Sequence, residues 1–401
     1  MNWPEIAILL LPVASLSGYL LGRRGGEKSS GQRVDLLSKQ YFQGLNHLLN
    51  EEQDQAIALF ERIADDDTDR FETQLALGNL FRRRGELERA IRLHQDLSVR
   101  AMLTTEQRSS ALLDLGDDFV RAGLLDRAEA LFDELLAIDA QSAPALKQLI
   151  GIYEQEREWR KAARAASEFE RLTLEPMGKL ISHFHCEAAL AAIVPLDAAI
   201  GEVDTRKSAS VDAYKAFDAS LALAKLADPD SVRVALMQAE RAIELDSVQI
   251  AQAALCHVVE TDVLFIPETL PILAKLRAIS ASSADALLEQ FLLIERGSNA
   301  LLARALTLPE PEAAALLHQR LKLKPSARVL ARWLKLRPCP SNQSGNDEGI
   351  GDLSFMFDSL TQATGSTLSH RCSQCGFGMV QQHWQCPSCR GWGTIKPLVA
   401  I

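Results

Sequence analysis

A repeat of thirty-four residues in the first half of the chain constrains its fold more than any other feature. Four copies align, and they begin at Leu37, Phe71, Ser109 and Ala143. A fixed period of this length is typical of a solenoid, in which each copy forms a pair of helices, A and B, and stacks on the next copy. A plain helical bundle is the alternative, but a bundle does not require a constant period. The chain is therefore predicted to be all-α, with a helical solenoid as its largest part.

Small residues occupy two positions of the repeat, where the helices of a pair are expected to cross. The eighth position holds Gly44, Gly78, Gly116 and, as an exception, Ile150; the twentieth holds Ala56, Ala90, Ala128 and Ala162. A larger side chain at a close helix crossing would force the helices apart. Gly85 and Gly123 fall between helices A and B of their copies, where they predict a turn. Together these features indicate tetratricopeptide repeats.

The repeat pattern changes at two places. The second and third copies start thirty-eight residues apart, so we expect four extra residues around Thr104–Gln107 to lengthen the loop between them, at little cost in stability. Beyond residue 172 the pattern fades into sequence rich in alanine and leucine, which predicts degenerate helical pairs. The helices expected there include Ile181–Ile200, Val211–Leu226 and Ser231–Leu245. The solenoid is thus predicted over residues 37–337, with clear copies in 37–172.

Solenoids of this kind bind extended segments or partner domains on a concave surface, which is lined mostly by the A helices. In the usual geometry of the repeat, several polar residues of this chain face that surface. They are Asn79, Arg82, Arg83, Asp117, Arg121, Lys147 and Glu154. Most charged side chains on helices are simply solvated, so each of these residues is a candidate for partner binding and not an assigned contact.

An apolar stretch near the N-terminus predicts a membrane anchor. Ile6–Gly22 contains seventeen residues without a charge, which is the lower limit for a transmembrane helix, and Arg23 and Arg24 follow it. Basic residues mark the cytoplasmic side, so residues 1–24 are predicted to cross a membrane once and to leave the rest of the chain in the cytoplasm. The alternatives are a buried core helix and a cleaved signal peptide, which would carry basic residues before its apolar core. Residues 25–36 are expected to form a flexible tether.

Four of the seven cysteines stand within the last thirty residues, in two pairs. Two residues separate Cys372 from Cys375 and Cys386 from Cys389, and ten residues separate the pairs. This spacing allows four thiolates to surround one zinc or iron ion tetrahedrally. Four protein ligands leave no open position for water, which favours a structural role over a catalytic one.

The alternative for these cysteines is that they are unligated or oxidised. The other three, Cys186, Cys256 and Cys339, are scattered, which is not the pattern of a disulfide framework. We therefore predict a metal ribbon over residues 370–401, preceded by a linker over 338–369 with a short helix at Leu353–Leu360. His383 is surplus to the four ligands.

The ribbon carries more aromatic surface than so small a module can bury by itself. Phe377, Trp384 and Trp392 all lie within it. We therefore expect part of the ribbon to dock on the solenoid.

Other classes of function find little support in the sequence. The formal net charge of −10 disfavours binding to nucleic acid, which needs a basic face. His183, His185 and Cys186 invite a metal assignment, but residues two apart on a helix point in different directions. No phosphate-binding loop, nucleophile elbow or zinc-protease motif is present. The chain is predicted not to be an enzyme.

The order of these parts resembles the lipopolysaccharide assembly protein B family of Gram-negative bacteria. The similar strings are the anchor LLLPVA followed by GRR, LGNLFRRRGELERAIRLHQ (Leu77–Gln95), AGLLDRAEALFDEL (Ala122–Leu135) and the cysteine segment Cys372–Pro397. The resemblance covers essentially the whole chain. It is weaker over Glu187–Arg337, where the sequence is rich in alanine and client-binding residues cannot be transferred.

The resemblance implies a rubredoxin-like ribbon that packs against the repeats, with Cys372, Cys375, Cys386 and Cys389 as the metal ligands. It also implies an adaptor at the cytoplasmic face of the inner membrane. Such an adaptor would help the membrane-bound protease FtsH degrade the deacetylase of the lipid A pathway, and an inner-membrane regulator of lipopolysaccharide synthesis would oppose it. A rubredoxin-like electron carrier and a general peptide-binding chaperone scaffold remain as alternatives.

Overall fold

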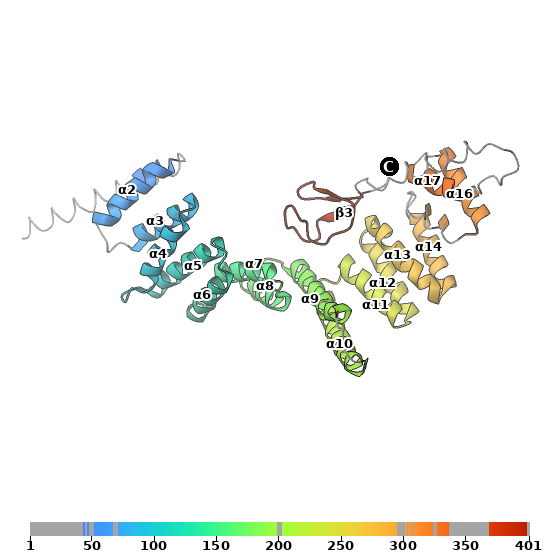
Figure 1. Cartoon of the computed structure of the whole chain (residues 1–401), viewed down its shortest axis with the longest axis horizontal. Helices are drawn as coiled ribbons and strands as arrows, with labels where there is room; N and C mark the ends of the chain where they lie inside the picture. Colours follow the sequence, from blue (N-terminus) through green and yellow to red (C-terminus); the bar gives the residue numbers. More distant parts are fainter. Residues whose placement is uncertain are drawn as a thin grey trace, which may run out of the picture. The chain divides into compact units, whose positions relative to one another are not determined.

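The computed structural model describes residues 43–44, 46–47, 52–66, 71–198, 203–294, 301–302, 304–305, 308–323, 327–336 and 369–398. The predicted anchor, the tether and nearly all of the predicted linker lie outside these residues. No helix in the described part is both long and apolar enough to cross a membrane. The described part is helical apart from three short strands near the C-terminus (Figure 1). It divides into two compact units, Met1–Ile152 and Tyr153–Ile401.

The first unit is built from successive helical hairpins. Its helices are α2 (Gln53–Asp66), α3 (Phe71–Arg84), α4 (Leu87–Ser98), α5 (Thr105–Arg121), α6 (Leu125–Ile138) and most of α7 (Ala143–Gln155). Within it α3 packs on α4, α4 on α5, and α5 on α6. The copies expected to begin at Phe71 and Ala143 begin at the first residue of a helix, as the repeat predicts.

The helix crossings explain why glycine recurs at the eighth position. A Cβ atom on Gly116 would lie 2.5 Å from the ring of Phe132, which is closer than real contacts allow. Gly78 meets the ring of His94 in the same way, and Gly44 meets Phe60. The eighth position therefore faces the twenty-fourth, where a large ring fills the space that glycine leaves.

The fourth copy carries the opposite sizes at these two positions. Ile150 stands at the eighth position and Ala166 at the twenty-fourth, and both are buried. The departure of Ile150 from the glycine pattern is thus matched by a small residue in the same copy. The alanines of the twentieth position, from Ala56 to Ala162, have no exposed surface in any of the four copies.

The turns between helices A and B form where glycine predicts them. Gly85 and Gly123 adopt φ angles of +87° and +74°, which residues other than glycine rarely adopt. The prediction of a longer loop around Thr104–Gln107 is only partly right: the loop between α4 and α5 has six residues, 99–104, against four between α6 and α7, but α5 already begins at Thr105. Thr104 caps α5 by accepting a hydrogen bond from the backbone N–H of Gln107, and the Gln107 side chain accepts one from Thr104 N–H. Because this capping box favours helix, the extra residues extend α5 at its start.

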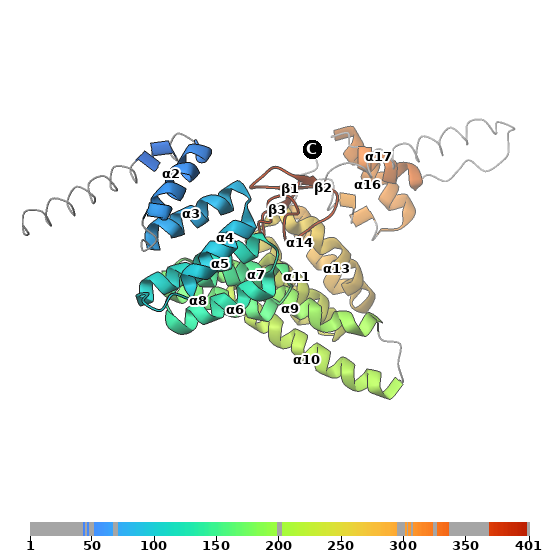
Figure 2. The same ribbon diagram turned by 60° about the vertical axis from the view of Figure 1, so that its left-hand side comes forward.

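The second unit continues with helices of less regular length. They are α8 (Trp159–Thr173), α9 (Gly178–Ala198), α10 (Val203–Ala227), α11 (Val232–Glu244), α12 (Val248–Thr261), the short η1 (Val263–Phe265), α13 (Ile266–Ile279), α14 (Ala281–Ile294), α16 (Glu310–Leu323) and α17 (Ala327–Lys335). The three helical stretches expected from the alanine-rich sequence correspond to α9, α10 and α11. In Figures 1 and 2, α9 and α10 run side by side along most of their length.

Two apolar clusters hold the helices from α9 to α14 together. One lies among α9, α10 and α11 and contains Cys186 and Phe217. The larger one lies among α11, α12, η1, α13 and α14 and contains Phe265 and Phe291. Trp384, which belongs to the cysteine segment, packs against this larger cluster. The helical core therefore extends to a side chain of the ribbon.

The ribbon contains a small antiparallel sheet of three strands, β1 (His370–Cys372), β2 (Gly378–Met379) and β3 (Ile395–Pro397), in the order β2-β1-β3. In this register His370 lies opposite Met379 on one side and Pro397 on the other. The sheet places the first cysteine of the metal set at the end of its central strand.

Candidate metal centre and its contacts with the helices

The two cysteine pairs form turns with the same hydrogen bonds. In the first, Cys372 N–H donates to Phe377 O and Gly376 N–H donates to Cys372 O, at 2.9 and 3.0 Å. In the second, Cys386 N–H donates to Gly391 O and Arg390 N–H donates to Cys386 O, at 2.9 and 2.8 Å. The residue after the second cysteine has a positive φ in both turns. Each turn therefore presents two sulfur atoms on one side.

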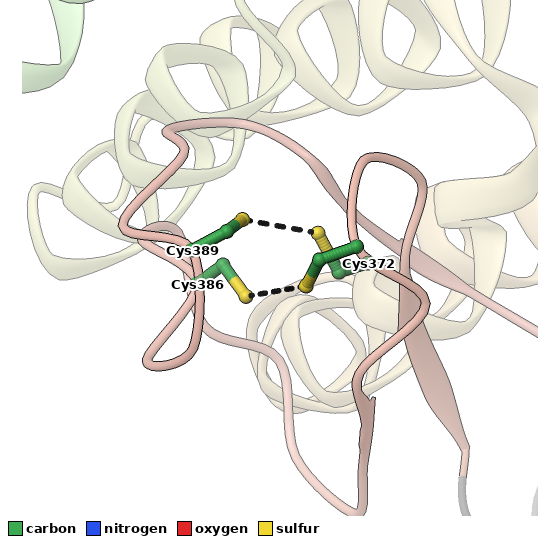
Figure 3. A group of neighbouring side chains, drawn as sticks. Cys372, Cys386 and Cys389 are labelled. Carbon is green, nitrogen blue, oxygen red and sulfur yellow. Dashed lines mark hydrogen bonds between the residues drawn. The ribbon is translucent and has the colours of Figure 1, made fainter. Parts of the chain in front are cut away.

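The two turns bring the four sulfurs into one cluster. The Sγ atoms of Cys372 and Cys389 lie 3.7 Å apart, as do those of Cys375 and Cys386 (Figure 3). All four Sγ atoms lie within 4.8 Å of one another. A disulfide requires about 2.05 Å, so these are not bonded pairs. A tetrahedral ion with bonds of about 2.3 Å would hold its ligands about 3.8 Å apart, which matches the spacing found.

The pKa values of the thiols show why the cluster suits a cation. Burial alone would raise the pKa of Cys372, but the hydroxyl of Thr394, 3.3 Å from its sulfur, and backbone N–H groups lower it to about 6. For Cys389, the backbone N–H of Gly391 acts to lower the pKa, but burial and the neighbouring sulfurs raise it to about 12. The thiolate of Cys372 therefore forms easily, whereas that of Cys389 does not, because negative charges on neighbouring sulfurs repel each other. A bound cation removes this repulsion.

The residues thus fit a single metal ion held by four thiolates, as the sequence predicts. Cys372 and Cys386 are buried, whereas Cys375 is exposed and Cys389 is half-buried. Such a ligand set accepts zinc or iron, and zinc would supply a structural cross-link without redox chemistry. Within the described part of the chain, this is the only group of three or more cysteine, histidine or acidic side chains close enough to share an ion.

Trp392, three residues after the last ligand, anchors the ribbon on α8 and α9. Its ring stacks on His183 with centroids 5.3 Å apart. It also meets the edges of Trp159 at 6.1 Å and Phe184 at 5.9 Å. Aromatic pairs at these distances stabilise beyond the area that they bury. The ribbon is therefore fixed to these two helices by a ring placed next to a metal ligand.

Trp384, two residues before the third ligand, anchors the ribbon on η1 and α11. Its ring stacks on Phe265 at 5.7 Å and 6° between planes, and the guanidinium carbon of Arg233 lies 5.6 Å from its centroid. The docking that the aromatic residues predict is confirmed for Trp384 and Trp392. The third aromatic residue, Phe377, remains 44% exposed.

Polar contacts surround the aromatic anchors. His370 Nε2 lies 2.9 Å from Glu268 Oε1 on α13. Lys396 Nζ lies 2.6 Å from Asp262 Oδ2, at the junction of α12 and η1. Both β1 and β3 are therefore tied to the helices by a charged or polar pair, in addition to the aromatic contacts.

A buried charged pair lies beneath the ribbon. Arg233 on α11 is 3% exposed and donates from Nη2 to Glu187 Oε1 on α9 at 2.6 Å. Its Nε and Nη1 find no acceptor among the described residues. Burial, and secondarily the charge of Arg233, lower the pKa of His183 to about 3, so this imidazole is neutral at physiological pH. Exposing this site by removing the ribbon would rehydrate a buried cation.

The structure gives the residues of the SHFHC segment packing roles. His183 contacts the ribbon, and Cys186 lies in the apolar cluster of α9, α10 and α11. Burial raises the pKa of Cys186 to about 12, which makes it an unreactive thiol. His383, the surplus histidine of the ribbon, is exposed.

Two of the predicted partner-binding residues join consecutive repeats of the first unit. Arg82 on α3 pairs with Asp114 at 2.7 Å and with Asp118 at 3.0 Å, both on α5. Asn79 donates to Asp114 at 3.2 Å. Asp118 in turn lies 2.6 Å from Nδ1 of the buried His94. Arg82 and Asn79 therefore have structural contacts within the chain.

The other candidates differ in their surroundings. Arg83, Arg121 and Lys147 are exposed. Asp117 is half-buried, and burial raises its pKa. Glu154 accepts a hydrogen bond from Nε1 of Trp392 and another from Gln385, so it binds the ribbon. Partner binding by any of these residues stays a prediction.

Sequence reasoning missed the helical side of the docking surface. Trp159, Arg233, Phe265 and Glu268 lie on four different elements and are scattered over more than a hundred residues. No spacing links them. The aromatic content of the ribbon was the only signal of this surface. It indicates that the ribbon docks on another part of the chain, but not which residues it docks on.

Comparisons with known proteins agree with this architecture. A family model described as a rubredoxin metal binding domain matches residues 370–397. Over 400 residues the chain is 33% identical to lipopolysaccharide assembly protein B of Escherichia coli (strain K12), and the match covers 98% of each protein. It is 30% identical over 410 residues to the protein of the same name from Haemophilus influenzae, again covering 98% of each.

Among solved structures, a tetratricopeptide repeat protein from Parabacteroides merdae aligns with 80% of this chain and 98% of its own length. The identity is 11% and the TM-score is 0.32.

Proposed function

This chain belongs to the lipopolysaccharide assembly protein B family, and we propose from that membership and from its architecture that it is an adaptor without catalytic activity of its own. A role in lipopolysaccharide assembly and the use of protein partners follow from the family. The adaptor would bring a client protein to a protease. In this proposal the client is the deacetylase of the lipid A pathway, and the protease that degrades it is FtsH.

The docked metal ribbon is the observation that supports this proposal most strongly. Trp384 and Trp392 flank metal ligands and are seated among α8, α9, α11 and η1, so an ion bound by the cysteines would hold the ribbon on these helices. Four protein thiolates leave no position at which a substrate could bind the ion. A rigid surface without an open metal position is suited to recognition.

We further propose that residues 1–24 anchor the chain in the inner membrane, with the repeats and ribbon on the cytoplasmic side. The support is the sequence itself, in which seventeen uncharged residues precede Arg23 and Arg24. An adaptor for a membrane-embedded protease benefits from confinement to the same surface, since tethering raises the effective concentration of one partner near the other. An inner-membrane regulator of lipopolysaccharide synthesis would act on the chain at this surface.

The test replaces the family member of Escherichia coli with this chain at native abundance and measures the half-life of the lipid A deacetylase after protein synthesis is stopped. The full chain is expected to keep the half-life short in cells with active FtsH and not in cells that lack it. Deletion of residues 1–24 is expected to lengthen the half-life, and an unrelated anchor of the same orientation distinguishes confinement from contacts within the bilayer. An unchanged half-life on deletion of the whole chain would contradict the adaptor function.

The exposure of Cys375 favours a second candidate function for this chain, that of a rubredoxin-like electron carrier. An iron site with an exposed thiolate can exchange electrons with a partner, whereas a zinc site cannot. Visible absorption and a reversible redox change in the purified, metal-loaded protein would support the carrier. A colourless protein with one zinc per chain would exclude it.

A further inference from the structure

A cleft of about 660 Å³ opens beside the docked ribbon, in the second unit of the chain. Its walls come from the start of α8, from one face of α9 and from residues 382–392 of the ribbon, which lie between β2 and β3. Neither the metal site nor the concave surface of the repeats explains it.

Tryptophan is concentrated in this cleft. Trp159, Trp384 and Trp392 line it, and these are three of the five tryptophans of the chain. All three are half-buried, so the anchors of the ribbon also present part of their surface to the cleft. Leu190, which is 37% exposed, and Ala191 extend this apolar wall along α9. Partly exposed tryptophans next to aliphatic groups are typical of the centres of protein-binding sites.

The charges of the cleft are not balanced. Glu187 lines it, but its carboxylate is held by the buried Arg233. Arg157, at the mouth, is exposed, and among the described residues its guanidinium has no ion-pair partner. One free cation therefore stands beside an aromatic surface. An occupant with a carboxylate next to an apolar side chain complements both features.

Arg157 occupies a position where glycine would suit the backbone better. It is the fifteenth residue of the fourth copy, and the second and third copies carry Gly85 and Gly123 there. Its φ angle is +59°, in the same left-handed region as those glycines. A side chain in this conformation costs free energy, and such strain is found most often at functional sites. The chain thus keeps a cation at the mouth of the cleft although a glycine would relieve strain.

We propose that this cleft binds an extended peptide segment of a partner protein, which places an apolar side chain against Trp159, Trp392 and Leu190 and a carboxylate against Arg157. The proposal deepens the adaptor function and rests on it. It assigns the recognition of an acidic, apolar segment to the junction of the ribbon and the helices, so that the metal-bound ribbon supplies part of the site.

The experiment pans a display library of random twelve-residue peptides on the full, metal-loaded chain in detergent. Enriched peptides are then synthesised with a fluorescent label, and their dissociation constants are measured by anisotropy. The variants are Arg157→Gly, which relieves the backbone strain, and Leu190→Glu, which opposes an acidic ligand. Arg164→Glu is the matched control, because Arg164 is an exposed arginine on α8 that does not line the cleft.

Enriched peptides are expected to combine acidic with aromatic or aliphatic residues. Their dissociation constants should rise about tenfold or more in Arg157→Gly and in Leu190→Glu, and should stay the same in Arg164→Glu. Arg157→Gly should be at least as stable to heat as the wild type, because it relieves the backbone strain, and this separates lost binding from lost folding. No enrichment, enrichment of basic peptides, or equal affinity for Arg157→Gly and the wild type would overturn the proposal. None of these results depends on the deacetylase half-life, so a failure of the cleft is distinguishable from a failure of the adaptor function.

Discussion

Trp392 Nε1 donates a hydrogen bond of 3.1 Å to Oε1 of Glu154, which joins the ribbon to the last turn of α7. The two residues are 238 positions apart in the chain. Glu154 belongs to the set expected to face the groove of the repeats, and here its partner is the ribbon of the same chain. A residue that the repeat pattern predicts for partner binding therefore binds the ribbon instead.

We expect Trp392→Phe to destabilise docking by about 1–3 kcal/mol, because it retains most of the ring contacts but leaves the carboxylate of Glu154 short of a donor. A double-mutant cycle with Glu154→Ala, followed by urea unfolding, should give a coupling energy of about 0.5–3 kcal/mol. Additive effects of the two substitutions would mean that this hydrogen bond contributes nothing to docking.

Replacing Cys372 and Cys375 together by serine should abolish metal retention, because two of the four ligands are lost and metal-binding free energy is folding free energy in so small a module. Metal content per chain is measured by atomic absorption after dialysis. Cys256→Ser is the control, since Cys256 lies on α12 outside the cluster. One zinc or iron ion per chain in the double variant would refute the four-cysteine site.

The helix crossings predict opposite effects for two glycines. Gly116→Ala should destabilise by about 1–3 kcal/mol, because the new Cβ would lie 2.5 Å from Phe132. Gly151→Ala, on α7, should stabilise by about 0.5–1 kcal/mol, since a Cβ there meets nothing within 4 Å and alanine favours helix. Thermal unfolding measures both. Equal shifts in the same direction would show that the crossing at Gly116 is not close-packed.

The low pKa of His183 predicts that acid weakens the docked state. Burial, and then the charge of Arg233, hold this pKa near 3, below the ordinary value of 6.5. Between these values the unfolded chain binds more protons than the folded one, so stability decreases as pH falls from about 6.5 toward 3. The loss is at most about 1.4 kcal/mol per pH unit.

His183→Phe isolates this contribution, because it keeps an aromatic ring on Trp392 and removes the titrating group while all four cysteines remain. The midpoint of urea unfolding is measured by tryptophan fluorescence at pH 7.0 and at pH 5.5. From the higher to the lower pH, this midpoint should decrease more in the wild type than in the variant. A pH dependence of the same size in both would assign it to other groups, such as the thiolates.

Local patterns allowed much of the fold to be predicted. The starts of α3 at Phe71 and of α7 at Ala143, and the turns at Gly85 and Gly123, follow from residues close together in the sequence. The metal site was predictable for the same reason, since each pair of cysteines sits in one turn. The extension of α5 was missed because the capping box of Thr104 and Gln107 decides it, and the repeat period alone does not contain that information.

The docking surface could not be predicted in the same way. Trp384 meets Phe265 and Arg233, which lie on η1 and α11, and the alanine-rich sequence between the repeats and the ribbon has no period that places these elements. Contacts between residues so distant in sequence are set by the packing of the whole unit. The aromatic residues of the ribbon predicted that docking occurs, and only the structure identifies its partners.

Hydrogen exchange with and without the metal tests most directly whether the ion holds the ribbon on the helices. Exchange is measured by mass spectrometry on the full chain, first loaded with zinc and then stripped by a chelator under reducing conditions. Removal of the ion should speed exchange in the ribbon and also in α9, η1 and the start of α13, while α3 to α6 stay unchanged as an internal reference. Faster exchange confined to residues 370–397, with α9 and η1 protected as before, would contradict the account.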